Sequence, residues 1–217
     1  MRFDLAIFDL DGTLIDSAGD IADCLNLALC EVGRRPLLRE QVVAMIGLGI
    51  DVLVERALGG PGHSEQARVA AAFRRHYADH PVGKTRLYPG VAELIERARG
   101  AGIVFAVATN KRTDITKQIL VALGLLPFLT VVIGDEPDLP RKPDPARVRK
   151  ILELTRIAPG RALYVGDSLV DLETARNAGL PCALVTWGYA DRAALSAAGP
   201  DHLIDRPAEL AALLGLT

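Results

Sequence analysis

Two aspartates, Asp9 and Asp11, stand one residue apart at the end of an apolar run, in the stretch FDLDGTLIDS. In an extended strand, residues i and i+2 face the same side, so both carboxylates project together at the carboxyl end of the strand. Burying such a pair costs several kcal/mol unless something neutralises it. Gly12 permits a sharp turn directly after the pair, and Thr13 supplies a donor for phosphate oxygens.

Polar residues close two further apolar runs. Thr109 ends the run IVFAVAT, and Asp167 ends the run ALYVGD. The carboxyl ends of parallel strands meet at one edge of a sheet, where ligands of open α/β folds bind. Each residue alone could instead cap a helix, as Asp and Thr often do. The whole set, together with the aspartate pair, favours a single site.

Several converging carboxylates need a cation. No cluster of His or Cys accompanies them, and oxygen ligands of this kind suit Mg²⁺, which keeps several waters and works with substrate phosphate. The sequence therefore predicts a magnesium ion and a phosphoryl group as the partners of the aspartate pair.

Alternating strands and helices must position these residues. Five apolar runs predict buried strands, and the segments between them have helical periodicity. The runs are LAIFDL, IVFAVAT, TVVIG, ALYVGD and CALVTW, with a short sixth, HLI, before a last helix from Pro207. This order predicts an α/β fold, a Rossmann-like parallel sheet with helices on both faces.

The segment between Ile15 and Leu87 breaks this alternation. It contains no convincing strand, and two of its stretches read as amphipathic helices. We expect a small all-helical cap domain at residues 16–87 and a catalytic core at residues 1–15 and 88–217. In the cap loop IGLGID, Gly47 and Gly49 either let the backbone approach the substrate or form a plain turn.

The composition of the 217 residues excludes several classes of partner. The net charge of −2 does not favour nucleic acid or an acidic membrane surface. No apolar run reaches the roughly 18 residues that span a bilayer, and acidic residues interrupt the N-terminal run where a signal peptide would be apolar. The cysteines, Cys24, Cys30 and Cys182, have no metal-binding spacing and are expected to be buried thiols in a reducing compartment. We expect a cytoplasmic protein, monomeric or homodimeric.

Four motifs together resemble those of the haloacid dehalogenase superfamily. They are DLDGTL from Asp9, TN at Thr109, RKPDP around Lys142 and GDSLVD with Asp167 and Asp171. Each motif is weak alone, but all four occur in the family's order and spacing. The resemblance covers essentially the whole chain, including the helical insert after the first motif.

The resemblance implies roles for the acidic residues. Asp9 would be the nucleophile that forms an aspartyl-phosphate, and Asp11 the general acid and later the general base. Mg²⁺ would be bound by Asp9, Asp167 and the backbone carbonyl of Asp11. Asp171 would contribute from outside the direct ligands.

The resemblance also implies which groups hold the phosphate. Thr109 and the backbone around Asn110 would bind phosphoryl oxygens, together with Gly12 and Thr13. Lys142 would neutralise the charge shared by the phosphate and Asp9. Fixed cations of this kind stabilise the charge that gathers on equatorial oxygens in phosphoryl transfer.

The second aspartate separates phosphoryl transfer from dehalogenation, because attack on carbon has no use for Asp11 as a proton donor. Hydrolysis of a small phosphorylated metabolite is the default over a phosphomutase, since nothing in the insert indicates return of the phosphoryl group. A non-catalytic protein that binds a phosphometabolite remains an alternative, although a pure binder needs no second acid beside phosphorus.

The substrate is less sharply indicated than the reaction. The stretches DLDGTLIDSAGDIADCLNLAL, VLVERAL, TRLYPGV and TWGY look most like bacterial phosphoglycolate phosphatases, which implies 2-phosphoglycolate. A sugar phosphate, a nucleotide and pyrophosphate remain open. A carboxylate substrate would require a cation, and the cap offers Arg56, Lys84, Arg86 or the pair Arg74 and Arg75.

Overall fold

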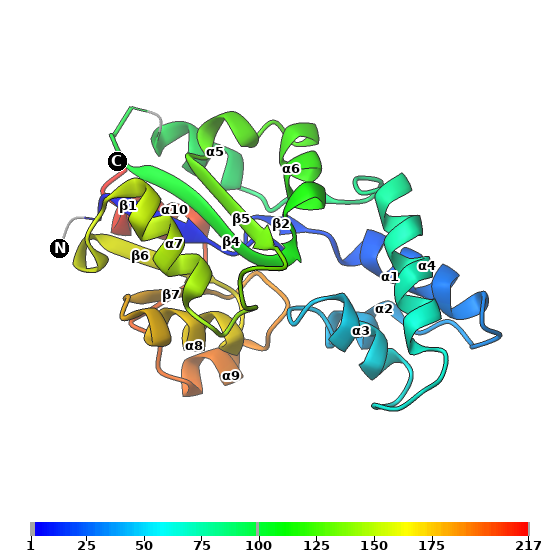
Figure 1. The fold of residues 1–217 in the computed structure, drawn as a ribbon. Helices are drawn as coiled ribbons and strands as arrows, with labels where there is room; N and C mark the ends of the chain where they lie inside the picture. The colour runs from blue at the N-terminus through cyan, green and yellow to red at the C-terminus, as the bar shows by residue number, and fades with distance from the viewer. Residues whose placement is uncertain (1–2, 99, 217) are drawn as a thin grey trace.

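The computed structural model describes residues 3–98 and 100–216, which form a parallel sheet flanked by helices and a group of helices beyond one end of it (Figure 1). The six strands lie in the order β5-β4-β1-β6-β7-β8, and every pair is parallel. They are β1 Leu5–Phe8, β4 Val104–Arg112, β5 Val131–Asp135, β6 Ala162–Gly166, β7 Cys182–Val185 and β8 His202–Ile204. The predicted fold class is confirmed.

The strands are mostly apolar because both faces of the sheet are covered, and β4 turns polar only at its carboxyl end, from Thr109 to Arg112. Along β1, Leu5 and Ile7 belong to one apolar core, whereas Ala6 and Phe8 belong to the other. All four are at most 1% exposed. Burial on both faces leaves the strand ends as the place where polar side chains reach a cavity.

Three helices cover each face of the sheet. The helices α5 Val91–Ala98, α6 Thr113–Ala122 and α10 Pro207–Leu213 share a core with Phe8. The helices α7 Ala146–Thr155, α8 Leu169–Ala178 and α9 Arg192–Ala197 share the other core with Ile7. Two short 3₁₀ turns, Leu126–Phe128 and Pro159–Arg161, precede β5 and β6.

Four helices form the group that we call the cap. They are α1 Ala18–Cys30, α2 Arg39–Val43, α3 Ile50–Ala57 and α4 Gln66–Asp79. Helix α1 packs along α4, and Leu25, Val69 and Phe73 are among their buried contacts. The cap lies beyond β2 in Figure 1, on the right of the view.

The ends of the insert depart from the all-helical prediction. Strands β2 Ile15–Asp16 and β3 Arg86–Leu87 pair antiparallel, Ile15 opposite Leu87. The two crossings between core and cap run side by side, so their backbone groups can satisfy one another. The division at residues 15–16 and 87–88 stays a prediction.

The expectation of three buried cysteines is wrong for one of them. Cys24 and Cys182 are buried, whereas Cys30 is exposed. Six residues along a helix turn the side chain by about 240°, so Cys24 and Cys30 occupy different faces of α1.

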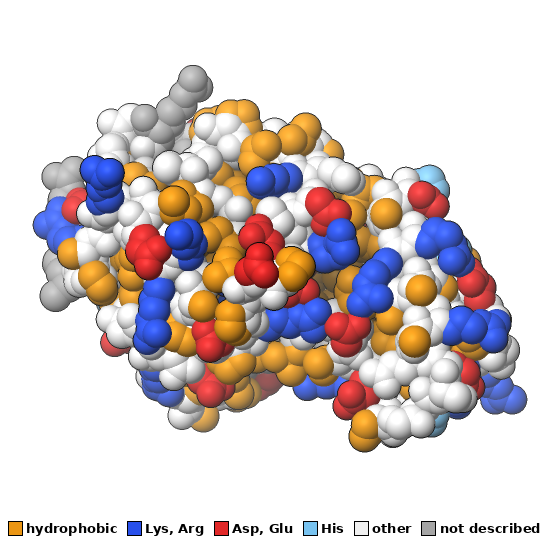
Figure 2. Space-filling view, in the orientation of Figure 1, with side chains coloured by type: hydrophobic (Ala, Val, Ile, Leu, Met, Phe, Trp, Pro, Cys, Tyr) orange, Lys and Arg blue, Asp and Glu red, His pale blue; other side chains and the backbone are white. Residues whose placement is uncertain are grey.

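Charged side chains of both signs are interspersed over the face of the molecule in Figure 2. The mixture on this face is in keeping with the small net charge of the chain. Among the described residues, no helix is both long and apolar enough to cross a bilayer.

Candidate active site

Asp9 follows β1 directly and lies at the carboxyl edge of the sheet, where it is 7% exposed. Its Oδ1 lies 2.7 Å from the Nζ of Lys142. Burial raises the pKa of Asp9 to about 6, although the ammonium of Lys142 opposes this shift. The charge of Asp171 and that of Asp11 raise the pKa further. A cation beside Asp9 would favour the ionised form that a nucleophile needs.

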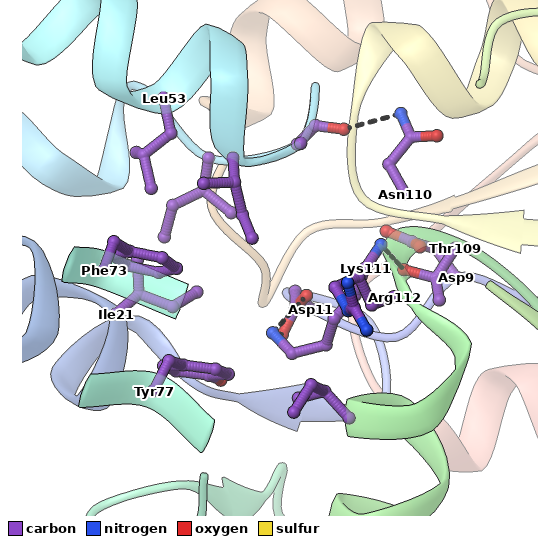
Figure 3. Close-up of a pocket in the computed structure, with 15 residues that line it drawn as sticks. Asp9, Asp11, Ile21, Leu53, Phe73, Tyr77, Thr109, Asn110, Lys111 and Arg112 are labelled. Atoms are coloured by element: carbon purple, nitrogen blue, oxygen red, sulfur yellow. Dashed lines mark hydrogen bonds and ion pairs between the residues drawn. The ribbon is translucent and has the colours of Figure 1, made fainter. Parts of the chain in front are cut away.

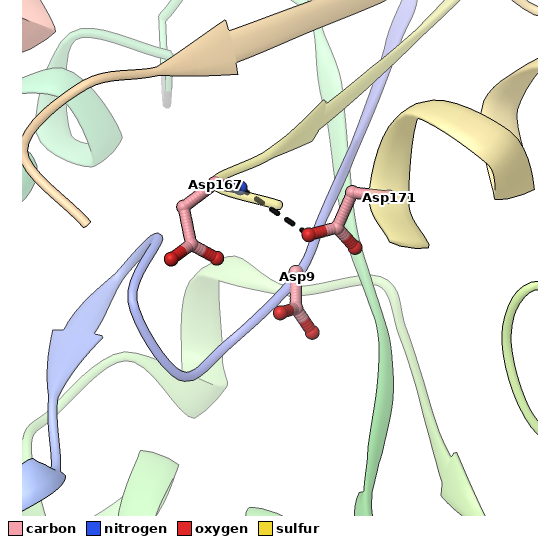
Figure 4. A group of neighbouring side chains, drawn as sticks. All are labelled: Asp9, Asp167 and Asp171. Carbon is pink, nitrogen blue, oxygen red and sulfur yellow. Dashed lines mark hydrogen bonds between the residues drawn. The ribbon is translucent and has the colours of Figure 1, made fainter. Parts of the chain in front are cut away.

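Asp9, Asp167 and Asp171 bring their carboxylates together in one buried cluster, whose possible ligand atoms lie within 4.8 Å of one another (Figure 4). Burial raises the pKa of Asp167 well above its usual range, and the neighbouring Asp171 and Asp9 add to the effect. The ammonium of Lys142 pairs with two of these desolvated carboxylates, Asp9 and Asp171. This all-oxygen set with excess negative charge fits a hard divalent cation.

The oxygens of Asp171 already have partners. Its Oδ1 accepts hydrogen bonds from Lys142 Nζ at 2.7 Å and from the hydroxyl of Tyr164 at 3.2 Å. Its Oδ2 accepts from Ser168 Oγ at 2.6 Å, in the capping box of α8. Asp171 therefore anchors Lys142, and its place outside the direct metal ligands stays a prediction.

The turn after Asp9 requires glycine. Gly12 has φ +86°, and a Cβ there would lie 2.2 Å from Asp167 Oδ2. Thr13 is buried, with its hydroxyl 3.5 Å from Asp167 Oδ1, and its carbonyl accepts a hydrogen bond from the indole of Trp187 at 3.0 Å. The turn thus holds Asp167 against the strand end. Phosphate binding by Gly12 and Thr13 stays a prediction.

The end of β4 brings Thr109 and Asn110 to the same edge. Thr109 Oγ1 accepts a hydrogen bond from the backbone N–H of Lys111 at 3.2 Å. The side chain of Asn110 is occupied elsewhere, because it accepts from Lys142 N at 2.9 Å and donates to the carbonyl of Gly47 at 3.0 Å. Asn110 therefore joins the Lys142 segment to the cap, and only its backbone is left for phosphate.

Asp11 lies near Asp9 along the chain but outside the carboxylate cluster. Both of its oxygens lie 3.0 Å from Lys111 Nζ, and Oδ1 also accepts a hydrogen bond from the hydroxyl of Ser17. Asp9 and Asp11 line the same cavity. The arrangement suits a metal site without the Asp11 carboxylate and leaves that carboxylate in the cavity as an acid.

The cavity lies between the sheet edge and the cap (Figure 3). Its core wall includes Asp9, Asp11, Thr109, Asn110, Lys111, Arg112 and Ile115. Its cap wall is mostly apolar and comprises Ile21, Ile46, Gly47, Gly49, Ile50, Leu53, Phe73 and Tyr77. Gly47 and Gly49 thus lie at the cavity, where their backbone could approach a substrate.

The cations predicted on the cap do not line this cavity. Arg74 pairs with Asp51, Arg75 with Glu31 and Lys84 with Asp23. The guanidinium group of Arg56 donates to the backbone carbonyl of Met45. That of Arg86 donates to the carbonyls of Gly83 and Thr85. Arg74 lines a second cavity, together with Asn110, Arg112 and Arg141 of the core. That one of these cations meets the substrate stays a prediction.

Sequence reasoning missed Lys111, which directly follows Thr109 and Asn110 and lines the cavity. The chain has only five lysines against twenty arginines. That scarcity marks Lys142 as unusual, and it marks Lys111 equally. Burial alone would lower the pKa of Lys111, but Asp11 and Tyr77 raise it above the usual range, so the side chain is cationic.

The parallel sheet, the buried aspartates at its carboxyl edge and the helical cap over them define a capped α/β fold with an acidic site between core and cap. Residues 6–185 match the haloacid dehalogenase-like hydrolase family. The chain belongs to that family, and the resemblance seen in its four motifs is confirmed.

Individual relatives extend over most of the chain. It is 37% identical to a phosphoglycolate phosphatase of Aquifex aeolicus over 208 residues, which cover 96% of this chain and 95% of that protein. It is 40% identical to a phosphoglycolate phosphatase of Cereibacter sphaeroides over 187 residues, covering 84% and 85%.

Solved structures share the complete fold. A crystal structure from Lactobacillus delbrueckii subsp. bulgaricus has a TM-score of 0.93 at 27% identity and covers 99% of both chains. The crystal structure of a predicted phosphoglycolate phosphatase from Haemophilus somnus has a TM-score of 0.89 at 30% identity, covering 98% of both chains. The cap and the core are therefore similar in arrangement across these proteins.

Proposed function

We propose that this protein is a Mg²⁺-dependent phosphatase that hydrolyses a small phosphomonoester, 2-phosphoglycolate, through an aspartyl-phosphate. The observation that carries the proposal is Asp9, a buried carboxylate paired with Lys142 at 2.7 Å, beside two further aspartates and beneath a cap. Curated relatives that are 37–40% identical over most of the chain and are named phosphoglycolate phosphatase support the substrate.

In the first step, an oxygen of Asp9 attacks phosphorus while the bond to the leaving oxygen breaks, and Asp11 donates a proton to the departing alkoxide. In the second step, Asp11 takes a proton from water, the water oxygen attacks phosphorus, and the carboxylate of Asp9 is released as inorganic phosphate forms. Lys142, held by Asp171, neutralises charge on the phosphoryl oxygens throughout.

Asp9, Asp167 and the backbone carbonyl of Asp11 would hold Mg²⁺. The bound ion would supply positive charge to the phosphoryl oxygens and to the nucleophile. The fit of these residues to the ion rests on the desolvated carboxylate cluster described above.

The apolar cap wall has a separate task in this mechanism. With the cap closed, Phe73, Leu53 and Ile50 keep bulk water away while the leaving group departs. Opening must then admit water for the second step and release the products, so cap motion contributes to turnover. The cytoplasmic location and a monomeric or homodimeric state are further parts of the proposal.

The test is phosphate release from a panel of phosphoesters with Mg²⁺ or with chelator. The panel contains 2-phosphoglycolate, sugar phosphates, nucleotides and pyrophosphate, and Asp9→Asn serves as the nucleophile variant. We expect 2-phosphoglycolate to stand well above the rest, chelator to abolish release, and Asp9→Asn to bind substrate without turnover. A broad, low profile would remove the substrate assignment, and binding without release by the wild type would favour a sensor.

A further inference from the structure

The positive charge in the cavity comes from the core. Among the described residues that line it, Lys111 and Arg112 are the cations. Arg112 points its guanidinium to Asp114, with contacts of 3.1 and 2.8 Å, and about half of its side chain is exposed. Lys111 is only 10% exposed in its side chain. It is therefore the cation that an anionic ligand in this cavity would meet.

The ammonium of Lys111 stands where the core meets the cap. On the core side, it lies 3.0 Å from each oxygen of Asp11. On the cap side, it lies 4.7 Å from the ring centroid of Tyr77, whose ring stacks on Phe73 (Figure 3). Tyr77 belongs to α4, so closing the cap places an aromatic face against this ammonium.

We propose that Lys111 is the specificity-determining residue that binds the carboxylate of the substrate. To do so, its ammonium gives up part of its contact with Asp11. This inference rests on the proposed function and deepens it. Lys111 directly follows Thr109 and Asn110 at the end of β4, so it is adjacent to the predicted phosphate site. In 2-phosphoglycolate a single methylene separates the ester oxygen from the carboxylate, so a phosphate beside Asp9 leaves the carboxylate in the cavity that Lys111 lines.

The exchange has a consequence for the general acid. In the structure, the ammonium occupies both oxygens of Asp11 and thereby restrains the carboxylate. An ammonium has three N–H donors, so it can keep one bond to Asp11 and give the others to a substrate carboxylate. One oxygen of Asp11 is then free to turn toward the leaving oxygen. An acidic substrate thus helps to release the acid that its own hydrolysis requires.

The apolar surroundings strengthen the discrimination. Ile21, Leu53 and Phe73 offer no hydrogen bond to a carboxylate, so its charge depends on Lys111. A charge-assisted hydrogen bond in such a site is worth roughly 10- to 100-fold in affinity. A neutral substrate of equal size would leave the Lys111–Asp11 pair intact and gain nothing from it.

The experiment compares two substrates of nearly equal shape, 2-phosphoglycolate and 2-phosphoglycolamide, in which a neutral amide replaces the carboxylate. The variants are Lys111→Met, Lys111→Arg and the control Lys117→Met, whose lysine is exposed on α6. Steady-state kcat and KM are measured for each pair with saturating Mg²⁺. Turnover of the amide within the same preparation reports whether a variant is folded.

We expect the wild type and Lys117→Met to prefer the carboxylate substrate by roughly 10- to 100-fold in kcat/KM. In Lys111→Met the preference collapses toward equal kcat/KM for the two substrates, chiefly because KM for the carboxylate substrate rises. Lys111→Arg keeps part of the preference. Equal losses on both substrates, or a preference that survives in Lys111→Met, would overturn the role of Lys111 alone. A wild type that hydrolyses neither compound would overturn the proposed function and this inference with it.

Discussion

Lys142 Nζ lies 2.7 Å from Asp9 Oδ1, and both side chains are almost completely buried. The same ammonium lies 2.7 Å from Asp171 Oδ1. One cation therefore links the predicted nucleophile to a residue at the first turn of α8, and the desolvation of all three groups makes each dependent on the others.

Lys142→Met should lower both activity and stability. Removing one partner from a buried ion pair costs about 3–5 kcal/mol in the free energy of unfolding, since it leaves uncompensated carboxylates. Loss of a fixed positive charge beside the phosphoryl group should lower kcat by roughly 10²- to 10³-fold. Chemical unfolding and steady-state assays with Mg²⁺ measure the two effects.

The matched control is Lys150→Met, because Lys150 is half exposed and pairs with Glu153 within α7. Its free energy of unfolding should stay within about 0.5 kcal/mol of the wild type. If Lys142→Met behaved like Lys150→Met in either assay, Lys142 would have no part in neutralising Asp9.

Asp167 and Asp171 should respond differently to substitution, although both lie in the carboxylate cluster. Asp167→Ala removes a predicted direct ligand and should raise the Mg²⁺ concentration for half-maximal activity by more than roughly 100-fold. Asp171→Asn loosens Lys142 and should raise that concentration by only about tenfold. This is the lower end of the loss of metal affinity that follows when a residue hydrogen-bonded to a metal ligand is replaced. Titrations of activity with Mg²⁺ distinguish them, and identical curves for both variants would contradict the division of roles.

Much of the core could be predicted because its strands are buried on both faces, and continuous apolar runs record that burial directly. The polar residues that end those runs, Asp9, Thr109 and Asp167, could likewise be placed at one edge, since parallel strands share a direction. The pairing of Lys142 with Asp171 follows from no periodicity. It depends on a loop and a helix end meeting in three dimensions.

The cap shows where sequence patterns stop being informative. Amphipathic periodicity predicts its helices, but it does not give the rotation of each helix toward the core. It therefore cannot choose among the cations of the cap, and in the structure Arg74 and Arg75 pair with Asp51 and Glu31. The cavity cation, Lys111, comes from the core. Long charged side chains reach several positions, and only the packed arrangement decides which one they take.

The metal-free protein should lose stability as the pH rises from about 4 to about 6. Burial raises the pKa of Asp9 from 3.8 to about 6, so in this range the folded state binds more protons than the unfolded state. Protonated Asp9 contributes its full stability below about pH 4. This contribution decreases as the pH rises and is lost above about pH 6. The pKa of Asp167, raised well above its usual range, extends the effect upward.

Mg²⁺ should oppose this loss, because it binds the ionised carboxylates. The increase in Tm on adding Mg²⁺ should therefore be larger at pH 7 than at pH 5, and it should shrink in Asp9→Asn. Thermal unfolding with Mg²⁺ or with chelator at both pH values provides the measurement. An increase of equal size at pH 5 and pH 7 would show that proton release from the cluster does not accompany metal binding.

Asn110 offers a test of the contact between cap and core. Its amide donates to the carbonyl of Gly47 at 3.0 Å, while its oxygen accepts from Lys142 N at 2.9 Å and from Arg147 Nη1 at 2.7 Å. Asn110→Asp keeps the acceptor for Lys142 N and Arg147 but removes the amide donor to two carbonyls, that of Gly47 in the cap and, at 3.2 Å, that of Lys142 in the core. We therefore expect the closed cap and the Lys142 segment to be destabilised, by roughly 1–3 kcal/mol together.

The expected readout of Asn110→Asp is a KM raised by about fivefold or more, with a smaller loss of stability than in Asn110→Ala. Asn110→Ala, which also leaves the Lys142 N–H and Arg147 unsatisfied, should lower stability as well. Asn177→Asp is the control, because Asn177 is an exposed residue of α8 whose amide donates to the carbonyl of Pro143, the residue after Lys142. If KM in Asn110→Asp matched that of Asn177→Asp, the hydrogen bond to Gly47 would contribute nothing to holding the cap over the substrate, and closure would depend on the apolar wall alone.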